Sequence, residues 1–176
     1  MPHTSRADLS HAFCSYCGYP PMGRWRDCAH RVCMRCQTGV VLRAPEGAEP
    51  GHDDPFLIVD RELAVQAVSR NAELVLSVDE PASLGVPLEE FLICCNSGRA
   101  RGELARLVEA AFAGVQPSTT LELLSATNRE LHLQVRVTTC GAPPGALLIL
   151  SPLATRATPS ANGRQLATVG FPDGAI

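Results

Sequence analysis

The chain lacks several features that would have indicated particular classes of protein. It contains no lysine, so all 15 of its basic residues are arginine, a usage typical of a GC-rich bacterial genome. No apolar run approaches the roughly 18 residues of a membrane-spanning helix, so we expect no membrane segment. Near the N-terminus, His3, Arg6 and Asp8 interrupt any apolar stretch, which argues against a signal peptide and favours a cytoplasmic protein.

Motifs of the common enzyme classes are also missing. The sequence has no G-x-S-x-G nucleophile motif, no Walker loop, no G-x-G-x-x-G and no H-E-x-x-H. Its 18 acidic residues are scattered over positions where a solvated helix or loop face is expected. We therefore assign no catalytic residue and expect that the protein is not an enzyme.

Cysteine, in contrast, is concentrated near the N-terminus. Two C-x2-C pairs, Cys14/Cys17 and Cys33/Cys36, stand fifteen residues apart. Each pair can place two thiolates on one face of a tight turn, and two such pairs close a tetrahedral site for structural zinc, Zn2+. Gly18 follows the first pair directly and can take the positive φ that such a turn often needs.

Other uses of these four cysteines are weighed against zinc. Disulfides would be expected in a secreted domain, and thioredoxin-like redox pairs would follow a strand of a larger α/β unit. Neither context is present in the sequence before Cys14, so both alternatives are less favoured than a metal site. Cys28 and His30, between the two pairs, are either additional or alternative ligands or small polar neighbours of the site.

Read together, the six residues form the pattern C-x2-C-x10-C-x-H-x2-C-x2-C. This pattern resembles the first six ligands of a RING-type cross-brace finger, but the fourth pair of that motif does not follow. The resemblance therefore implies a single-zinc module of half-RING or treble-clef type, without ubiquitin-ligase function. We place this finger at residues 11–43.

Composition divides the rest of the chain. Residues 44–53 are rich in Pro, Gly and acidic residues and are predicted to be a linker that separates two cores. We therefore expect residues 52–153 to fold alone and to stay folded when removal of the metal unfolds the finger. Residues 154–176 lack periodicity and are predicted to be a disordered tail. The whole chain has 45% hydrophobic residues, which indicates a real core, and the intervening residues 54–153 are long enough to form one ordinary domain.

Hydrophobic patterning predicts an α+β fold for residues 54–153. The first and last strands are apolar on both faces, which favours central positions in a sheet, whereas the fourth strand alternates. This gives a five-stranded antiparallel sheet of order 2-1-5-4-3 with helices on one face, and Asn71 as the N-cap of the first helical turn. The predicted strands are Phe56–Val59, Leu63–Ser69, Thr119–Leu124, Leu131–Thr138 and Ala146–Leu150, and the predicted helices are Leu88–Cys95 and Gly102–Gly114.

This order of elements resembles a PAS domain over residues 54–153. The stretches that carry the resemblance are DPFLIVDRELAVQAVSRNAELVLSV, GVPLEEFL and LHLQVRVTT…GALLILSPL. The resemblance implies a sensor or dimerising adaptor, with a homodimer formed through this domain. It also implies an apolar pocket lined by Leu, Val and Phe that could take a small ligand.

No haem or flavin is expected in such a pocket. The order Cys94-Cys95-Asn96 differs from the cysteine motif of flavin photosensors, and the domain's His132 lies on the polar side of a strand. Cys94 and Cys95 are interpreted as small buried residues that end an apolar helix. A thiol sensor is the alternative, with Cys94 pairing with another chain or with Cys140.

The combined features favour a cytoplasmic bacterial regulatory protein whose finger contacts a protein partner. The alternative is a DNA-binding transcriptional regulator. Residues 1–43 carry six Arg against two acids, and residues 52–153 carry seven Arg against thirteen acids. Because zinc with four thiolates is itself negative, the basic footprint is weak. The arginines that would meet phosphates are Arg24, Arg26, Arg31 and Arg35.

Overall fold

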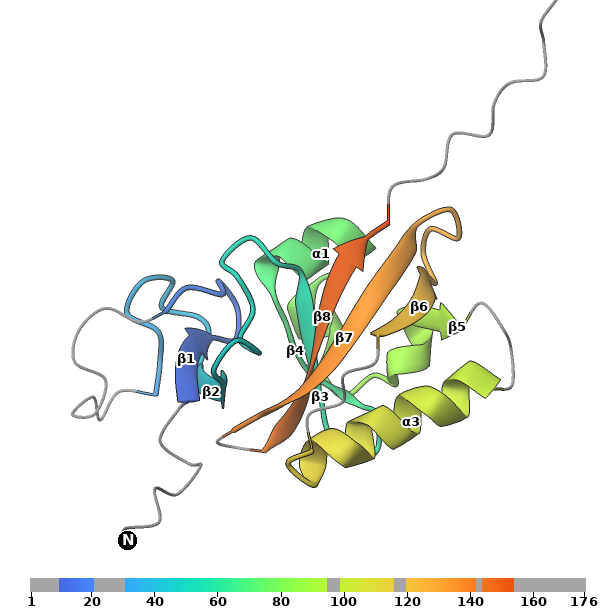
Figure 1. The fold of residues 1–176 in the computed structure, drawn as a ribbon. Coiled ribbons are helices and arrows are strands. Elements are labelled where there is room, and N and C mark those ends of the chain that lie inside the picture. Colours follow the sequence, from blue (N-terminus) through green and yellow to red (C-terminus); the bar gives the residue numbers. More distant parts are fainter. Residues whose placement is uncertain (1–9, 21–30, 95–98, 116–119, 142–143, 154–176) are drawn as a thin grey trace, which may run out of the picture.

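The computed structural model describes residues 10–20, 31–94, 99–115, 120–141 and 144–153. These residues form two β-sheets that pack together (Figure 1). In the smaller sheet, β1 (Ser10–Cys14) pairs antiparallel with β2 (Val41–Pro45). The larger, or main, sheet has six strands in the order β4-β3-β8-β7-β6-β5. The predicted disordered tail, residues 154–176, lies outside the described residues.

All neighbouring strands of the main sheet are antiparallel, and the helices pack on one of its faces. This arrangement agrees with the predicted α+β class. None of the helices in the described ranges is long and apolar enough to cross a membrane. The elements after β2 are β3 (Phe56–Val59), β4 (Val65–Val68), α1 (Arg70–Leu76), α2 (Glu80–Ser83), the 3-10 helix η3 (Leu88–Glu90), β5 (Leu92–Cys94), α3 (Arg99–Phe112), β6 (Thr120–Ser125), β7 (His132–Cys140) and β8 (Gly145–Pro152).

The main sheet has one strand more than the sequence predicted. The predicted helix Leu88–Cys95 is wrong, because η3 occupies its start and β5 pairs with β6 at the sheet edge. A short apolar run does not by periodicity distinguish a strand from a buried helix, and here pairing with β6 decided the outcome. The predicted count of five strands and the predicted order, which lacked this edge strand, were therefore wrong.

The N-cap of α1 also differs from the prediction. Ser69, and not Asn71, caps the helix: its Oγ accepts a hydrogen bond from the N–H of Ala72 at 3.2 Å. The same Oγ accepts from the N–H of Phe56 at 2.9 Å, so it joins the helix to the first central strand. Asn71 lies inside the helix and donates its side-chain amide to the carbonyl of His52 at 3.2 Å.

The two central strands, β3 and β8, are buried on both faces, each against a different partner. On one face, their side chains join the helices in the principal core. On the other face, they pack against the small sheet in a second core, where the Phe13 and Phe56 rings meet edge to face at 5.7 Å. This second core consists of Phe13, Leu42, Ala44, Phe56, Ile58, Ala67, Cys140, Leu147 and Ile149.

The predicted linker, residues 44–53, packs against both sheets. β2 extends into it as far as Pro45, and Ala48 is buried. The backbones of Arg43 and Gly141 exchange hydrogen bonds of 2.6 and 2.9 Å, which tie β2 to the end of β7. Arg136 donates its Nη1 to the carbonyl of Gly47 at 3.1 Å. The small sheet and the main sheet therefore share a core, although the boundaries 11–43 and 54–153 stay predictions.

Candidate metal site and adjoining pockets

The structure brings together the four cysteines that the sequence singled out. Their sulfurs all lie within 4.8 Å of one another, an arrangement that could hold a metal ion. The sulfurs of Cys14 and Cys36 are 3.6 Å apart, and those of Cys17 and Cys33 are 3.9 Å apart. Each of these contacts joins one C-x2-C pair to the other, so both pairs face a single point.

Cys28 and His30 lie outside the described residues. Their role as additional or alternative ligands therefore stays a prediction.

The same backbone turn presents each pair of cysteines. In the first turn, the N–H of Gly18 donates to the carbonyl of Cys14 at 3.0 Å, and Gly18 has a φ of +70°. In the second, the N–H of Gln37 donates to the carbonyl of Cys33 at 2.9 Å, and Gln37 has a φ of +59°. The positive φ expected at Gly18 is confirmed. Gln37 takes the same conformation at a cost of about 1 kcal/mol, because its Cβ disfavours it.

Backbone N–H groups point at the sulfurs. Tyr16 and Cys17 both donate to the sulfur of Cys14, and Gly39 donates to that of Cys36, each at 3.4 Å. Burial raises the pKa of Cys14 and of Cys17. Burial acts in the same direction on Cys36, but donors such as the Gly39 N–H outweigh it and lower its pKa to about 7. A bound cation would hold all four sulfurs as thiolates, the form that ligates metals.

Gly39 is required by the close approach of the two turns. A Cβ built on Gly39 would lie against the sulfur of Cys14 and 2.8 Å from both the Cβ and the N of Tyr16. Cβ atoms essentially never come this close to such neighbours, so any larger residue must push the first turn away from the second. Gly39 belongs to the site although it carries no ligand atom.

We expect Gly39→Ala to weaken metal affinity by about tenfold or more, because the added methyl displaces Cys14 or Tyr16. Competition with a chromophoric chelator measures this affinity. Gly141→Ala is the matched control, since nothing lies within 4 Å of a Cβ added there. Equal metal affinity in the two variants would contradict the packing of the turns described above.

The first turn is also bonded to α1 of the main domain. Tyr16, between two candidate ligands, donates its hydroxyl to Oε2 of Glu73 at 3.1 Å. The other carboxylate oxygen of Glu73 accepts from the backbone N–H of Glu80, at the start of α2, at 2.7 Å. The carbonyl of Tyr16 accepts from the N–H of Arg70 at 2.9 Å. Burial, followed by the bond to Glu73, raises the pKa of Tyr16.

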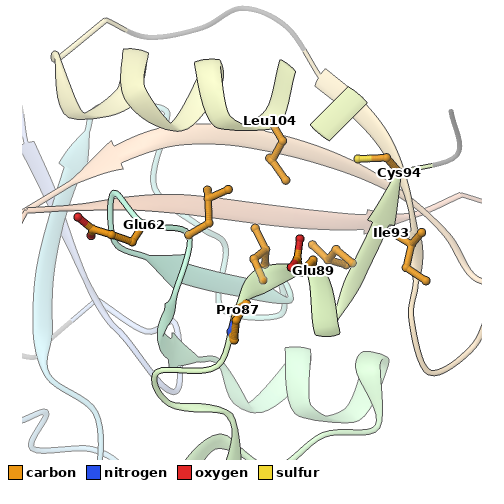
Figure 2. A pocket seen from close by; sticks show the side chains of 9 residues that line it. Glu62, Pro87, Glu89, Ile93, Cys94 and Leu104 are labelled. Carbon is orange, nitrogen blue, oxygen red and sulfur yellow. The ribbon is translucent and has the colours of Figure 1, made fainter. Parts of the chain in front are cut away.

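A second site is a pocket of about 410 Å³ on the helix-covered side of the main sheet (Figure 2). In Figure 2, Leu104 descends from α3 toward the pocket, and Cys94 points toward it from the end of β5. Leucine lines the pocket as expected, but the expected Val and Phe are not among its described lining residues. The lining residues are Glu62, Leu63, Pro87, Leu88, Glu89, Leu92, Ile93, Cys94 and Leu104.

Two further described cysteines, Cys94 and Cys140, lie apart from the candidate metal site. Cys94 is half-buried and ends a strand, so its predicted position at the end of a helix is wrong. It packs against the principal core, whereas Cys140 is buried in the second core, on the opposite face of the main sheet. This placement excludes the proposed pairing of Cys94 with Cys140 within one chain. Burial raises the pKa of the Cys140 thiol to about 12. Cys95 lies outside the described residues.

His132 lies on the exposed side of β7. Its Nδ1 is 2.8 Å from Oε1 of Glu122 on the neighbouring strand, and its side chain is 43% exposed. It does not line the 410 Å³ pocket.

Comparison with known proteins gives similar structures but no matching family. No protein-family model matches the chain, and no curated protein matches it. A domain of an HTR-like protein from Haloarcula marismortui is similar, with 12% identity and a TM-score of 0.43, over 58% of this chain and 99% of that chain. The PAS domain of a protein from Desulfitobacterium hafniense has 18% identity and a TM-score of 0.44, over 57% of this chain and 93% of that chain.

Proposed function

We propose that the protein is a bacterial signalling regulator in which a structural zinc site and a PAS-like sensor domain form one folded unit. The observation that carries this proposal is the pocket between η3, β5 and α3, with its largely apolar lining. Pockets of this size and composition bind small molecules, and a few polar groups at the rim fix their orientation.

Zinc is the metal proposed for the four-cysteine site. A tetrahedron with zinc–sulfur bonds of about 2.3 Å has edges of about 3.8 Å. The separations of 3.6 Å and 3.9 Å between sulfurs of opposite pairs match these edges. Four soft thiolate ligands in a closed site suit structural zinc, which leaves no open position for a reacting molecule.

The PAS-like assignment of the main domain is supported by its architecture. Its antiparallel sheet carries the helices on one face and has a pocket beneath α3. The lining carboxylates, Glu62 and Glu89, are exposed to solvent. We therefore propose that the pocket binds a ligand and does not catalyse a reaction. No haem or flavin role is proposed for it.

The proposed mode of action follows from the contacts between the two parts. A ligand in the pocket would change the position of η3 and of the segment that precedes it. The first cysteine turn is bonded to α1 through Tyr16 and Glu73. It would move with this segment and so alter the surface that a protein partner contacts. We also propose a homodimer formed through the main domain and a cytoplasmic location.

Filling the pocket tests the sensor role. We expect some members of a panel of medium-chain fatty acids and small aromatic compounds to raise the melting temperature by several degrees. A ligand at 100 times its Kd adds about 2.7 kcal/mol of stability. Cys94→Trp should abolish this shift, since the indole would occupy the pocket from a half-buried position. Leu84→Trp, at an exposed residue outside the lining, is the control. A panel without any stabilising compound would count against the sensor role.

A further inference from the structure

A groove of about 510 Å³ lies where the second cysteine turn meets α1. One wall comes from the cysteine-bearing segment and the other from the start of the main domain. The side chains that line it differ from those of the apolar pocket, because most of them are polar or charged. They are Cys17, Tyr19, Arg35, Cys36, His52, Asp53, Arg70, Asn71 and Leu74.

Arg35 is held in a defined position on one wall. Its guanidinium carbon lies 3.3 Å from the centre of the Tyr19 ring, in a cation–π contact. The same ring also contacts His52, with ring centres 4.9 Å apart. Stacking occupies the flat face of the guanidinium but leaves its N–H edge available for a carboxylate.

Arg70, on the opposite wall, supplies a second positive charge. Within the described ranges, neither the Arg70 nor the Arg35 side chain has an ion-pair or hydrogen-bond partner. The acidic side chain in the lining, Asp53, already lies 2.6 Å from Nε2 of His52. The groove thus has two guanidinium groups whose charge the described part of the chain does not pair.

An apolar contact point lies next to these charges. Leu74, on the outer side of α1, is 73% exposed although it is a large hydrophobic residue. Protein interfaces are enriched in arginine and aromatic residues around an apolar contact, and the groove contains all three.

We infer that this groove binds an acidic segment of a partner polypeptide, with carboxylates at Arg35 and Arg70 and an apolar side chain on Leu74. This inference rests on the proposed role of the cysteine-bearing segment in contacting a protein. The groove is unsuitable for a chain of phosphates because Asp53 and the half-buried Cys17 and Cys36, which would be thiolates around a bound metal, add negative charge to its lining. Residues 52–153 also carry thirteen acids against seven arginines. A peptide with one or two carboxylates avoids that repulsion.

Peptide selection on the full-length, metal-loaded protein tests the inference. A phage-displayed library of random 12-residue peptides should yield binders in which Asp or Glu stands next to a large apolar residue. Synthetic copies of these binders are then titrated by fluorescence anisotropy. Arg35→Ala and Arg70→Ala should each weaken binding about tenfold. Arg61→Ala is the matched control, since Arg61 lies over the Phe112 ring and does not line the groove.

Three results would overturn the inference. The first is that the selected peptides are not enriched in Asp or Glu. The second is that Arg35→Ala and Arg70→Ala bind the selected peptides as tightly as the unchanged protein does. The third is that a 20-base-pair DNA duplex binds more tightly than the peptides and depends on Arg70. Binders that need Met34, exposed on the second cysteine turn, but not Arg70 would place the partner elsewhere on this segment. In that case the proposed function would stand and the groove would not. If the protein binds neither zinc nor a pocket ligand but still binds acidic peptides through Arg35 and Arg70, the groove inference would stand and the proposed function would not.

Discussion

Replacing Cys33 by serine is expected to release the metal and to disorder the segment that carries the four cysteines. Serine keeps the size of the side chain, but its hydroxyl is rarely deprotonated and is a poor ligand for zinc. Structural zinc contributes on the order of 10 kcal/mol to the folding of such a segment, so the loss of one ligand removes most of its stability. Because Phe13, next to the candidate ligand Cys14, belongs to the core shared with the main sheet, the melting temperature of the whole chain should fall as well.

Cys28→Ser is the matched control for this change. If Cys28 lies beside the site without binding the metal, its replacement costs about 1 kcal/mol or less and the metal is retained. Elemental analysis after dialysis against a weak chelator measures retention in both variants. Equal loss of metal would show that the ligands are wrongly assigned. Two metal ions per chain would make Cys28 and His30 ligands of a second site.

The second large effect is expected from Phe13→Ala, in the core between the two sheets. Phe13 is 1% exposed and packs edge to face on Phe56, and truncation of a buried phenylalanine costs about 3–5 kcal/mol. Urea denaturation of the metal-loaded protein measures the change in the free energy of unfolding. Met34→Ala, at a residue that is 69% exposed, should change it by less than about 0.5 kcal/mol.

The shared core also bears on whether residues 52–153 fold alone, which stays a prediction. Without the small sheet, this fragment would expose four large residues of β3 and β8, namely Phe56, Ile58, Leu147 and Ile149. We expect this fragment to be less stable than the full chain and prone to association. A fragment as stable as the full chain, together with a silent Phe13→Ala, would show that the small sheet contributes nothing to the main domain.

Local patterns in the sequence predicted the elements that depend on local residues. The spacing of the cysteines predicted which four sulfurs meet, and Gly18 predicted the turn that presents two of them. The alternation of residues Leu131–Thr138 predicted β7. In this strand Leu133, Val135 and Val137 are buried, whereas His132, Gln134 and Arg136 are half-buried or exposed. β5 was missed because three residues carry no periodicity, and their strand conformation depends on pairing with β6.

The packing of the small sheet on the main sheet was not predicted, although a signal for it was present. Apolar residues on both faces of β3 and β8 were interpreted as the mark of central strands. The helices cover one face of these two strands. The interpretation does not say what covers Phe56 and Ile149 on the other face. Their partners, Phe13 and Leu42, belong to the segment for which the sequence predicts a separate zinc finger. The family resemblance implied an apolar pocket, but its position and its full lining could not be predicted, and neither could the groove, because residues distant in sequence line both of them.

The bond between Tyr16 and Glu73 has a consequence for how binding to this protein is measured. Tyr16 lies between two candidate metal ligands and donates its hydroxyl to Glu73. Glu73 also accepts from the N–H of Glu80, at the start of the segment that leads to the pocket residues Pro87 and Leu88. If a pocket ligand moves this segment as proposed, it would alter the bond between Tyr16 and Glu73, and we expect its affinity to depend on whether the metal is bound. Thermodynamic linkage makes the dependence reciprocal: a ligand that binds more tightly to the metal-loaded form tightens metal binding by the same factor. Affinities obtained with metal-depleted protein would therefore describe a different equilibrium from those of the loaded form.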